Sequence, residues 1–317
     1  MHCAPAGCSS KAISAKQMNP RVSILVAAWN AAAYIAETIQ SVQSQSFASW
    51  ELILVDDGST DETAEISRKY ATSDQRIKIY QQPNQGAHIA RNYAFSKSSG
   101  DYVVILDADD RILPKKIETQ VKILDSNLNY DVVYGDTWHC DQFMNRVVLE
   151  SKKYPAQHIS GDIFDEIILG NRFAVHAGMV RRVVLEDVGL HDPNPNLIAD
   201  WDFWVRVAEK YRFFYDNQVV AEYRIHPGMS ANIDSGKKQF HQRMNTVANI
   251  ERLSRYALVS RSIKNNIMFA NARFAQKYGL HAEAIEIAKK MIFDQPLRIR
   301  NYLLYGYSLL NKCGGRA

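Results

Sequence analysis

The sequence VSILVAAWN spans residues 22–30, and WELILVDDGSTD spans residues 50–61. Each stretch begins with an apolar run that is too continuous for a strand with one solvated face, so both predict buried strands. Between them, Tyr34, Ile35, Ile39 and Val42 recur at helical spacing, and Asn30 is placed to cap that helix. A strand, a helix and a second strand in succession predict an α/β fold.

The same alternation continues along the chain. Strand-like runs follow at residues 77–81, 102–106 and 131–135, with helical patterns beginning near Ala87 and Pro114. The regular alternation predicts a mainly parallel central sheet covered by helices on both faces. Asp56 and Asp57 follow one predicted strand, and Asp107, Asp109 and Asp110 follow another. Ligands of such sheets bind beyond the carboxyl ends of the strands, where both acidic groups are expected.

The acidic groups indicate a site for a cation and a phosphorylated ligand. Three carboxylates within four residues repel one another unless a cation or hydrogen-bond donors neutralise them, and carboxylate oxygens suit Mg²⁺ or Mn²⁺. If each motif is considered alone, the 107–110 group would be interpreted as a solvated acidic turn and DDGSTD as a turn that caps a helix. The sequence holds no GxGxxG and no GxxxxGK followed by Ser or Thr, so dinucleotide folds and phosphate-loop NTPases lack support.

Six motifs in order resemble those of the family 2 inverting glycosyltransferases. They are residues 22–30, residues 56–61, Asn84-Gln-Gly86 with Ala90-Arg-Asn92, Leu106 to Asp110, Ala199 to Trp204, and Tyr223-Arg-Ile-His226. The resemblance covers residues 21–232. It implies a GT-A fold, a nucleotide-diphosphate-sugar donor, Mn²⁺ or Mg²⁺ as cofactor and a cytoplasmic active site.

The resemblance also implies roles for individual residues. In the expected donor-binding set, the backbone of Ala27, Ala28 and Trp29 lines the base and ribose pocket, and Asp57 hydrogen-bonds the base. Gly86 belongs to the same set, and Arg91 binds phosphate or orients an acidic loop residue. Asp107 and Asp109 contact the ribose and the metal. The expected metal ligands are Asp109, Asp110 and His226, and which of Asp107, Asp109 and Asp110 binds the ion stays open.

Asp200 resembles the family's general base. It begins a predicted helix, where the helix dipole favours the ionised carboxylate that a base needs. Without the resemblance, Asp200 would be interpreted as a helix cap and His226, beside Pro227, as a structural histidine. Ala27 and Ala28 replace the family's usual Pro and Thr or Ser, and Ala199 replaces Glu. The last change puts the orientation of the base or the acceptor in question.

Charge divides the 317 residues unevenly. Residues 236–317 hold 15 Lys and Arg against 4 Asp and Glu, a net +11, whereas the whole chain is only +4. Four amphipathic helices are predicted there, and one of them carries Tyr302, Leu303, Gly306 and Leu310 on a stripe. We therefore expect a flexible tail at residues 1–20, a catalytic domain at residues 21–235 and a basic helical region at residues 236–317. That region fits peripheral contact with an anionic membrane or partner.

Together these features predict an inverting glycosyltransferase, with UDP-sugar the most frequent donor type among relatives. The expected acceptor is a hydroxyl of a glycan or lipid-linked saccharide. Nucleic acid is not an expected partner, because the basic helices lack an aromatic stacking platform. With no apolar run near 20 residues, no secretory signal and scattered cysteines, the expected location is the cytoplasm, at most peripheral at the inner membrane face. The alternatives are a sugar nucleotidyltransferase and a catalytically degenerate sugar-nucleotide-binding protein.

Overall fold

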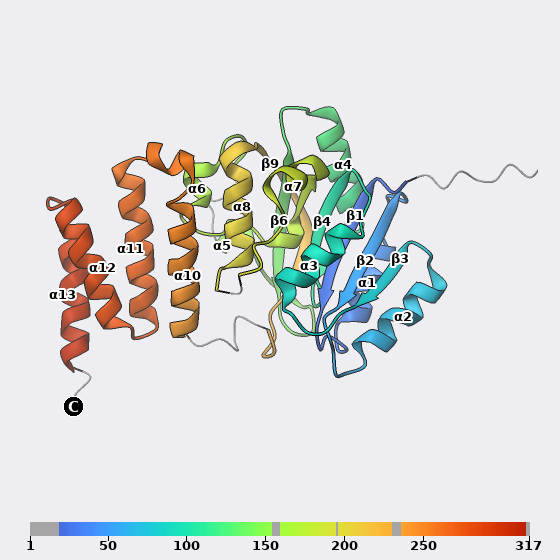
Figure 1. Ribbon diagram of the computed structural model, residues 1–317, viewed down its shortest axis with the longest axis horizontal. Coiled ribbons are helices and arrows are strands. Elements are labelled where there is room, and N and C mark those ends of the chain that lie inside the picture. The colour runs from blue at the N-terminus through green and yellow to red at the C-terminus, as the bar shows by residue number, and fades with distance from the viewer. Residues whose placement is uncertain (1–18, 154–158, 195, 230–235, 315–317) are drawn as a thin grey trace, which may run out of the picture.

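The computed structural model describes residues 19–153, 159–194, 196–229 and 236–314 (Figure 1). Nearly all of the predicted N-terminal tail, and the boundary predicted at residue 235, lie outside these ranges. The described residues form a mixed α/β layer structure with a run of helices at one end. Its central sheet has nine strands among the described residues.

Half of the sheet is parallel, as the regular alternation predicts. Its strands lie in the order β3-β2-β1-β4. Their bounds are β1 (Val22–Ala28), β2 (Trp50–Asp56), β3 (Ile77–Gln81) and β4 (Tyr102–Asp107). Ala28 lies opposite Asp56, and Ala27 lies opposite Asp107. The two acidic strand ends therefore flank the end of β1 at one edge of the sheet.

Four helices connect these strands and lead out of β4. They are α1 (Ile35–Gln43), α2 (Thr63–Ser73), α3 (Ala87–Ser96) and α4 (Lys116–Ser126). The predicted cap of α1 is wrong. Asn30 has a left-handed backbone with φ 49°, and its side-chain oxygen accepts a hydrogen bond from the Thr60 N–H at 2.9 Å. Asn30 therefore joins β1 to the DDGSTD turn instead of starting the helix.

The other half of the sheet mixes directions. β8 (Gly178–Arg181) is antiparallel to β4 and to β6 (Val132–Cys140), and β9 (Phe213–Arg224) is parallel to β6. β5 (Arg111–Ile112) pairs antiparallel with β9, and β7 (Arg146–Leu149) pairs antiparallel with β6. The predicted α/β class is confirmed, and β9 is one continuous strand of 12 residues. Short helical segments connect this half: α5 (Glu150–Lys153), α6 (Phe164–Ile167), η1 (Val175–Ala177) and α7 (Arg182–Val188).

Both faces of the sheet are covered. Ile24 and Leu52 point to the face that α1 and α4 cover, while Leu25 and Ile53 point to the other. On the second face lies α8 (Ala199–Lys210), which buries its aromatic residues in the same core cluster. Successive strand residues alternate between the two faces, so β1, β2 and β4 are buried on both sides.

The predicted C-terminal helices are present. They are α10 (Gly236–Ile250), α11 (Arg261–Lys277), α12 (His281–Asp294) and α13 (Ile299–Gly314), with the short turn η2 (Ser254–Leu258) after α10. α10 packs on α8, and α11, α12 and α13 follow in series, so α13 forms the end of the molecule (Figure 1). Across the described ranges, no helix combines the length and the hydropathy needed to cross a bilayer.

Candidate active site

Asp57 directly follows β2 and is buried. Its Oδ1 accepts hydrogen bonds from the Gln82 side-chain amide at 2.7 Å and the Gln85 N–H at 2.9 Å, and its Oδ2 accepts one from the Gly86 N–H at 2.8 Å. A carboxylate has roughly four acceptor positions, so one remains for a ligand donor such as the N–H of a base. The carboxylate also fixes the segment that leads into α3.

Gly58 allows this arrangement by its lack of a side chain. Its φ is +73°, and a Cβ built there would lie 2.7 Å from the Asn84 nitrogen. Both the left-handed backbone and the close approach exclude larger residues. The turn after β2 and the segment before α3 therefore form one packed unit.

Arg91, on α3, joins two predicted site residues. One guanidinium nitrogen donates to Asp107 Oδ1, and the other donates to Asp200 Oδ1 at 3.0 Å. Arg91 itself is buried, whereas both carboxylates stay about one quarter exposed, with 28% of each side chain accessible. Burial lowers the pKa of Arg91, but the charges of Asp107 and Asp200 outweigh this and raise it. The end of β4 and the start of α8 are thus connected by one permanent cation.

Asp200 lies in the first turn of α8 and is held by its neighbour. The Trp201 indole N–H donates to the Ile167 carbonyl at 2.6 Å, which anchors the helix start in the core. Burial raises the pKa of the Asp200 carboxyl, and the Arg91 charge opposes that rise. A raised pKa makes a carboxylate a better proton acceptor, while Arg91 keeps it ionised.

The acidic loop after β4 is tied to two histidines. Asp109 Oδ2 lies 2.9 Å from His226 Nε2, and Asp110 Oδ2 lies 3.0 Å from His176 Nδ1. Arg224, at the end of β9, fixes the loop backbone. Its Nε donates to the Asp109 carbonyl at 2.8 Å, and its N–H donates to Asp110 Oδ1 at 2.7 Å.

Asp107, Asp110 and His176 fit a divalent cation. One ligand atom from each lies within 4.8 Å of the others. In the described part of the chain, Asp110 Oδ2 and both nitrogens of His176 are buried without a hydrogen-bond partner, although Asp110 and His176 face each other. Burial raises the pKa of Asp110 to about 6 against the opposing charge of His176. A bound cation would offset this cost, because it favours the ionised carboxylate.

This set shares Asp110 with the expected ligands Asp109, Asp110 and His226, and it includes Asp107, whose part in metal binding the sequence left open. Asp109 and His226 form their own pair beside it. His176 lies on η1, in a region without regular periodicity, and no sequence signal marked it. Arg224 lies inside the quoted motif Tyr223-Arg-Ile-His226, and the same motif could have directed attention to it.

The end of β1 lies between the acidic groups. The Ala28 carbonyl accepts a hydrogen bond from the Asp57 N–H at 2.8 Å, and Ala27 lies beside Asp107 across the strand pair. Trp29 is 56% exposed just beyond the strand. The structure therefore brings together at one sheet edge the predicted residues of β1, β2, β4, α3 and α8.

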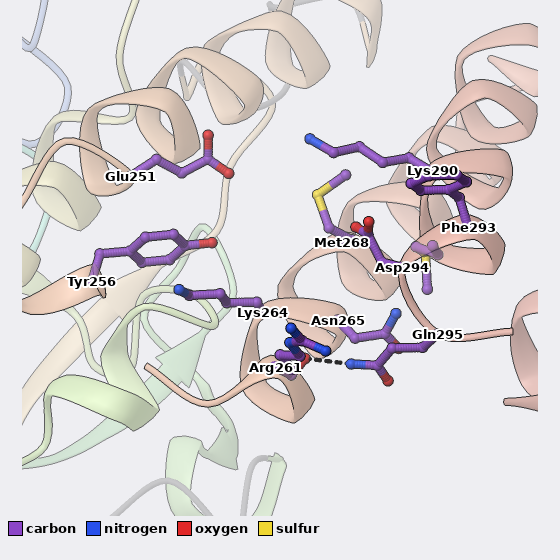
Figure 2. Close-up of a pocket in the computed structure, with 11 residues that line it drawn as sticks. Glu251, Tyr256, Arg261, Lys264, Asn265, Met268, Lys290, Phe293, Asp294 and Gln295 are labelled. Carbon is purple, nitrogen blue, oxygen red and sulfur yellow. Dashed lines mark hydrogen bonds between the residues drawn. The ribbon is translucent and has the colours of Figure 1, made fainter. Parts of the chain in front are cut away.

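A pocket of about 520 Å³ lies elsewhere, among the C-terminal helices (Figure 2). Lys264 of α11 and Lys290 of α12 line it, with Tyr256 on η2. It shares no lining residue with the acidic edge, so it is a separate feature of the molecule.

Comparison with known proteins identifies similar chains. A family model described as glycosyl transferase family 2 matches residues 23–189. An uncharacterized glycosyltransferase of Haemophilus influenzae is 34% identical over 164 residues, which are 51% of this chain and 63% of that protein. The putative teichuronic acid biosynthesis glycosyltransferase TuaG of Bacillus subtilis is 32% identical over 215 residues, 65% of this chain and 79% of that protein.

Solved structures share the fold. S. aureus TarS 1-349 in complex with UDP-GlcNAc has a TM-score of 0.63 and 18% identity, covering 93% of this chain and 92% of that one. The mannosyltransferase PcManGT from Pyrobaculum calidifontis, in complex with GDP-Man and Mn²⁺, has a TM-score of 0.61 and 17% identity, covering 93% and 86%. Because both structures align with 93% of this chain, the similarity of fold extends into the C-terminal helices.

Proposed function

The chain belongs to glycosyltransferase family 2, and we propose that it transfers a sugar from a nucleotide-diphosphate donor, a UDP-sugar, to a hydroxyl of a glycan or lipid-linked saccharide. The observation that carries this proposal is the Arg91 fork, which joins Asp107 to Asp200. The guanidinium group of Arg91 therefore bridges Asp107, a carboxylate on the donor side, and Asp200, the candidate base.

The donor nucleotide is assigned to the edge between β1 and β2. The remaining acceptor position of Asp57 takes an N–H of the base, and the backbone at Ala27 to Trp29 lines the base and ribose. Gly86 keeps the wall of this site open, because a Cβ added there would meet nothing within 4 Å. Support comes from similar folds crystallised with UDP-GlcNAc and GDP-Man.

The diphosphate is assigned to the loop after β4. Asp107, Asp110 and His176 would hold Mn²⁺ or Mg²⁺, with Asp109 and His226 as the alternative set next to it. When bound, such an ion stabilises the negative charge of the leaving diphosphate. Arg91 holds Asp107 in place and supplies a fixed positive charge at the same edge.

Asp200 is assigned the proton transfer. The acceptor hydroxyl oxygen attacks the anomeric carbon from the side opposite the diphosphate, its proton passes to Asp200 Oδ, and the bond to the diphosphate oxygen breaks. One carboxylate suffices for this single displacement, which inverts the anomeric configuration. No second carboxylate is required as a nucleophile.

The domain division and the location are part of the proposal. Residues 21–235 form the catalytic domain, and residues 236–317 form a basic helical region that adjusts where the enzyme meets its acceptor. We place the enzyme in the cytoplasm, peripheral at the inner membrane face, with no nucleic-acid partner. The charge of +11 on the helical region supports this placement.

A donor screen tests the function. The melting temperature is measured with UDP, GDP, UDP-GlcNAc and GDP-mannose, each with and without Mn²⁺, and release of UDP or GDP is followed with added saccharide acceptors. We expect UDP and UDP-sugar to raise the melting temperature and UDP to be released. Binding without release would instead favour the degenerate binding protein. Release of pyrophosphate from a nucleoside triphosphate with a sugar phosphate would favour the nucleotidyltransferase.

A further inference from the structure

α4 begins with a lysine whose side chain is buried, with only 1% of the residue exposed. The Lys116 ammonium donates hydrogen bonds to the Gln120 side-chain oxygen and, at 3.1 Å, to the Gly178 carbonyl. Both acceptors are neutral, and burial lowers the pKa of Lys116 to about 7. A cation among neutral groups loses its hydration without gaining the attraction of an opposite charge, which costs free energy that a methionine would not. Lys116 is therefore better explained by its hydrogen bonds than by its packing.

Gln120, one turn further along α4, completes a small network. Its side chain is fully buried, and its amide nitrogen donates to the Ala177 carbonyl at 2.8 Å. Lys116 and Gln120 thus bind two successive carbonyls, those of Ala177 and Gly178, and they also bind each other. We call Lys116 and Gln120 the α4 clamp.

The two carbonyls directly follow His176. His176 lies in the single turn η1, and the Ala177 carbonyl stands at the end of that turn, where a helical turn leaves carbonyls without partners of its own. Gly178 also packs against the Trp204 ring of α8, and a Cβ added to Gly178 would lie 3.1 Å from that ring. The segment after His176 is therefore held by hydrogen bonds from α4 and by packing on α8.

The position of this segment affects the imidazole of His176. The ring is fully buried, stacks on Tyr223 with centroids 6.0 Å apart, and places its Nδ1 3.0 Å from Asp110 Oδ2. The pairing of β8 with β4 and β6 brings η1 to the acidic loop, while the bonds from α4 fix the turn itself. A metal ligand that is displaced by about 1 Å binds poorly, so the residues that support a ligand influence the affinity of the site.

We propose that the α4 clamp positions His176 against Asp110 through the two carbonyls that follow the histidine. Lys116 and Gln120 contact neither donor nor cation in this role, so they are positioning residues. The inference deepens the proposed function and rests on it for one point, that His176 and Asp110 hold Mn²⁺ or Mg²⁺. The placement of the imidazole does not depend on that assignment.

Mn²⁺ binding to the full chain tests the α4 clamp. The dissociation constant is measured from the electron paramagnetic resonance signal of free Mn²⁺, with and without UDP. Lys116→Met and Gln120→Met keep most of each side chain's length but remove the donor, and each should weaken binding about tenfold. Gln120→Glu should weaken binding as much, because its carboxylate repels the Ala177 carbonyl. Its melting temperature should be nearer that of the wild type, since the same carboxylate pairs with the charge of Lys116.

Arg181→Met is the matched control at the other end of β8. Arg181 donates to the carbonyls of Leu124, on α4, and Tyr130 at 2.6 and 3.1 Å, so it also binds carbonyls where α4 meets β8. Its loss should lower the melting temperature and leave the affinity for Mn²⁺ unchanged. Wild-type affinity in both Gln120 variants, or an equal loss of affinity in Arg181→Met, would show that the α4 clamp only stabilises the fold, and the proposal would be wrong.

Crystal structures without metal distinguish a failure of this proposal from a failure of the proposed function. The distance from His176 Nδ1 to Asp110 Oδ2 should exceed about 3.6 Å in Gln120→Glu and stay at hydrogen-bond length in Arg181→Met. An unchanged contact in Gln120→Glu overturns the positioning role. If the wild type binds no Mn²⁺, or His176→Ala binds it as tightly as the wild type, the metal assignment is wrong, and the two crystal structures still decide whether the α4 clamp places the imidazole.

Discussion

α8 and α13 are both amphipathic helices, yet they direct their apolar faces in opposite directions. α8 buries Trp201, Phe203 and Trp204 in the main core and carries Asp200 at its exposed start. α13 buries Asn301 and Ser308 and leaves leucines in solvent. Amphipathic spacing therefore shows that a helix has an apolar face, but the neighbouring elements decide whether that face closes a core or remains available. The predictions below test that difference from its largest expected effect to its smallest.

Asp200→Asn should have the largest effect, because the start of α8 carries the proposed chemistry. Asparagine keeps the shape but cannot take the acceptor proton, so kcat should fall about 1,000-fold. Donor binding, measured by calorimetry, should stay within about twofold, since Asp200 does not contact the proposed nucleotide site.

Asp202→Asn is the matched control on the same helix. Asp202 is buried and accepts hydrogen bonds from Arg206 at 2.8 Å and Asn249 at 3.3 Å, away from Arg91. Its loss should lower the free energy of unfolding by about 1 to 3 kcal/mol and leave kcat at low temperature unchanged. Equal losses of kcat in both variants would remove Asp200 from its assigned role.

Truncating one residue of each apolar face tests the comparison directly. Trp204 packs on Phe173 and Phe213 with ring centroids at 4.9 and 5.9 Å, so Trp204→Ala should cost about 3 to 5 kcal/mol of unfolding free energy. Leu310→Ala removes a solvent-exposed side chain and should cost less than about 0.5 kcal/mol. Urea unfolding measures both. A cost above about 2 kcal/mol for Leu310→Ala would show that its side chain is covered in solution.

Much of the parallel half could be predicted from the sequence. Strands that are apolar throughout, such as Ile24 to Val26, have no solvated face, and their connecting helices and turns are local in sequence. The acidic residues at the strand ends followed from the same reasoning. The structure of the parallel half is therefore determined largely by short stretches of sequence.

The mixed half and the second part of the site could not be predicted in this way. β8 is only four residues long, and its pairing with β4 and β6 joins segments distant in sequence. His176 reaches Asp110 only because this pairing places η1 beside the acidic loop. Likewise, the direction of the α13 stripe depends on which helices pack against it. Pairings of this kind depend on tertiary contacts that a local pattern does not encode.

The pH dependence of kcat tests the electrostatics at the start of α8. A general base works only when it is ionised, so kcat falls as the pH falls through the pKa of Asp200. Burial raises that pKa, so the fall should occur above the usual range of an aspartate. Arg91→Gln removes the opposing cation and should move the acidic limb to higher pH by about one unit.

The control for this pH profile is a variant that replaces an arginine whose side chain does not contact Asp200. Arg206→Gln, on the same helix, loses the ion pair to Asp202, the bonds to nearby carbonyls and the contact with the Phe203 ring, none of which involves Asp200. Its acidic limb, measured at saturating donor, should match that of the wild type. If Arg91→Gln also shows the wild-type limb, the carboxylate that limits the rate at low pH is not Asp200.

Ser308→Ala should have a small effect on stability, and it tests what holds α13 in place. Ser308 Oγ accepts a hydrogen bond from the Gln276 amide at 2.7 Å and donates to the Leu304 carbonyl at 2.9 Å, all buried. Because Gln276 keeps the Leu304 carbonyl at 3.2 Å, the expected cost is only about 1 kcal/mol. Ser96→Ala, which removes an exposed hydroxyl on α3, should cost less than about 0.5 kcal/mol. A larger cost for Ser308→Ala than for Ser96→Ala would show that this buried polar network helps to attach α13, whereas equal small values would show that the network contributes little to stability.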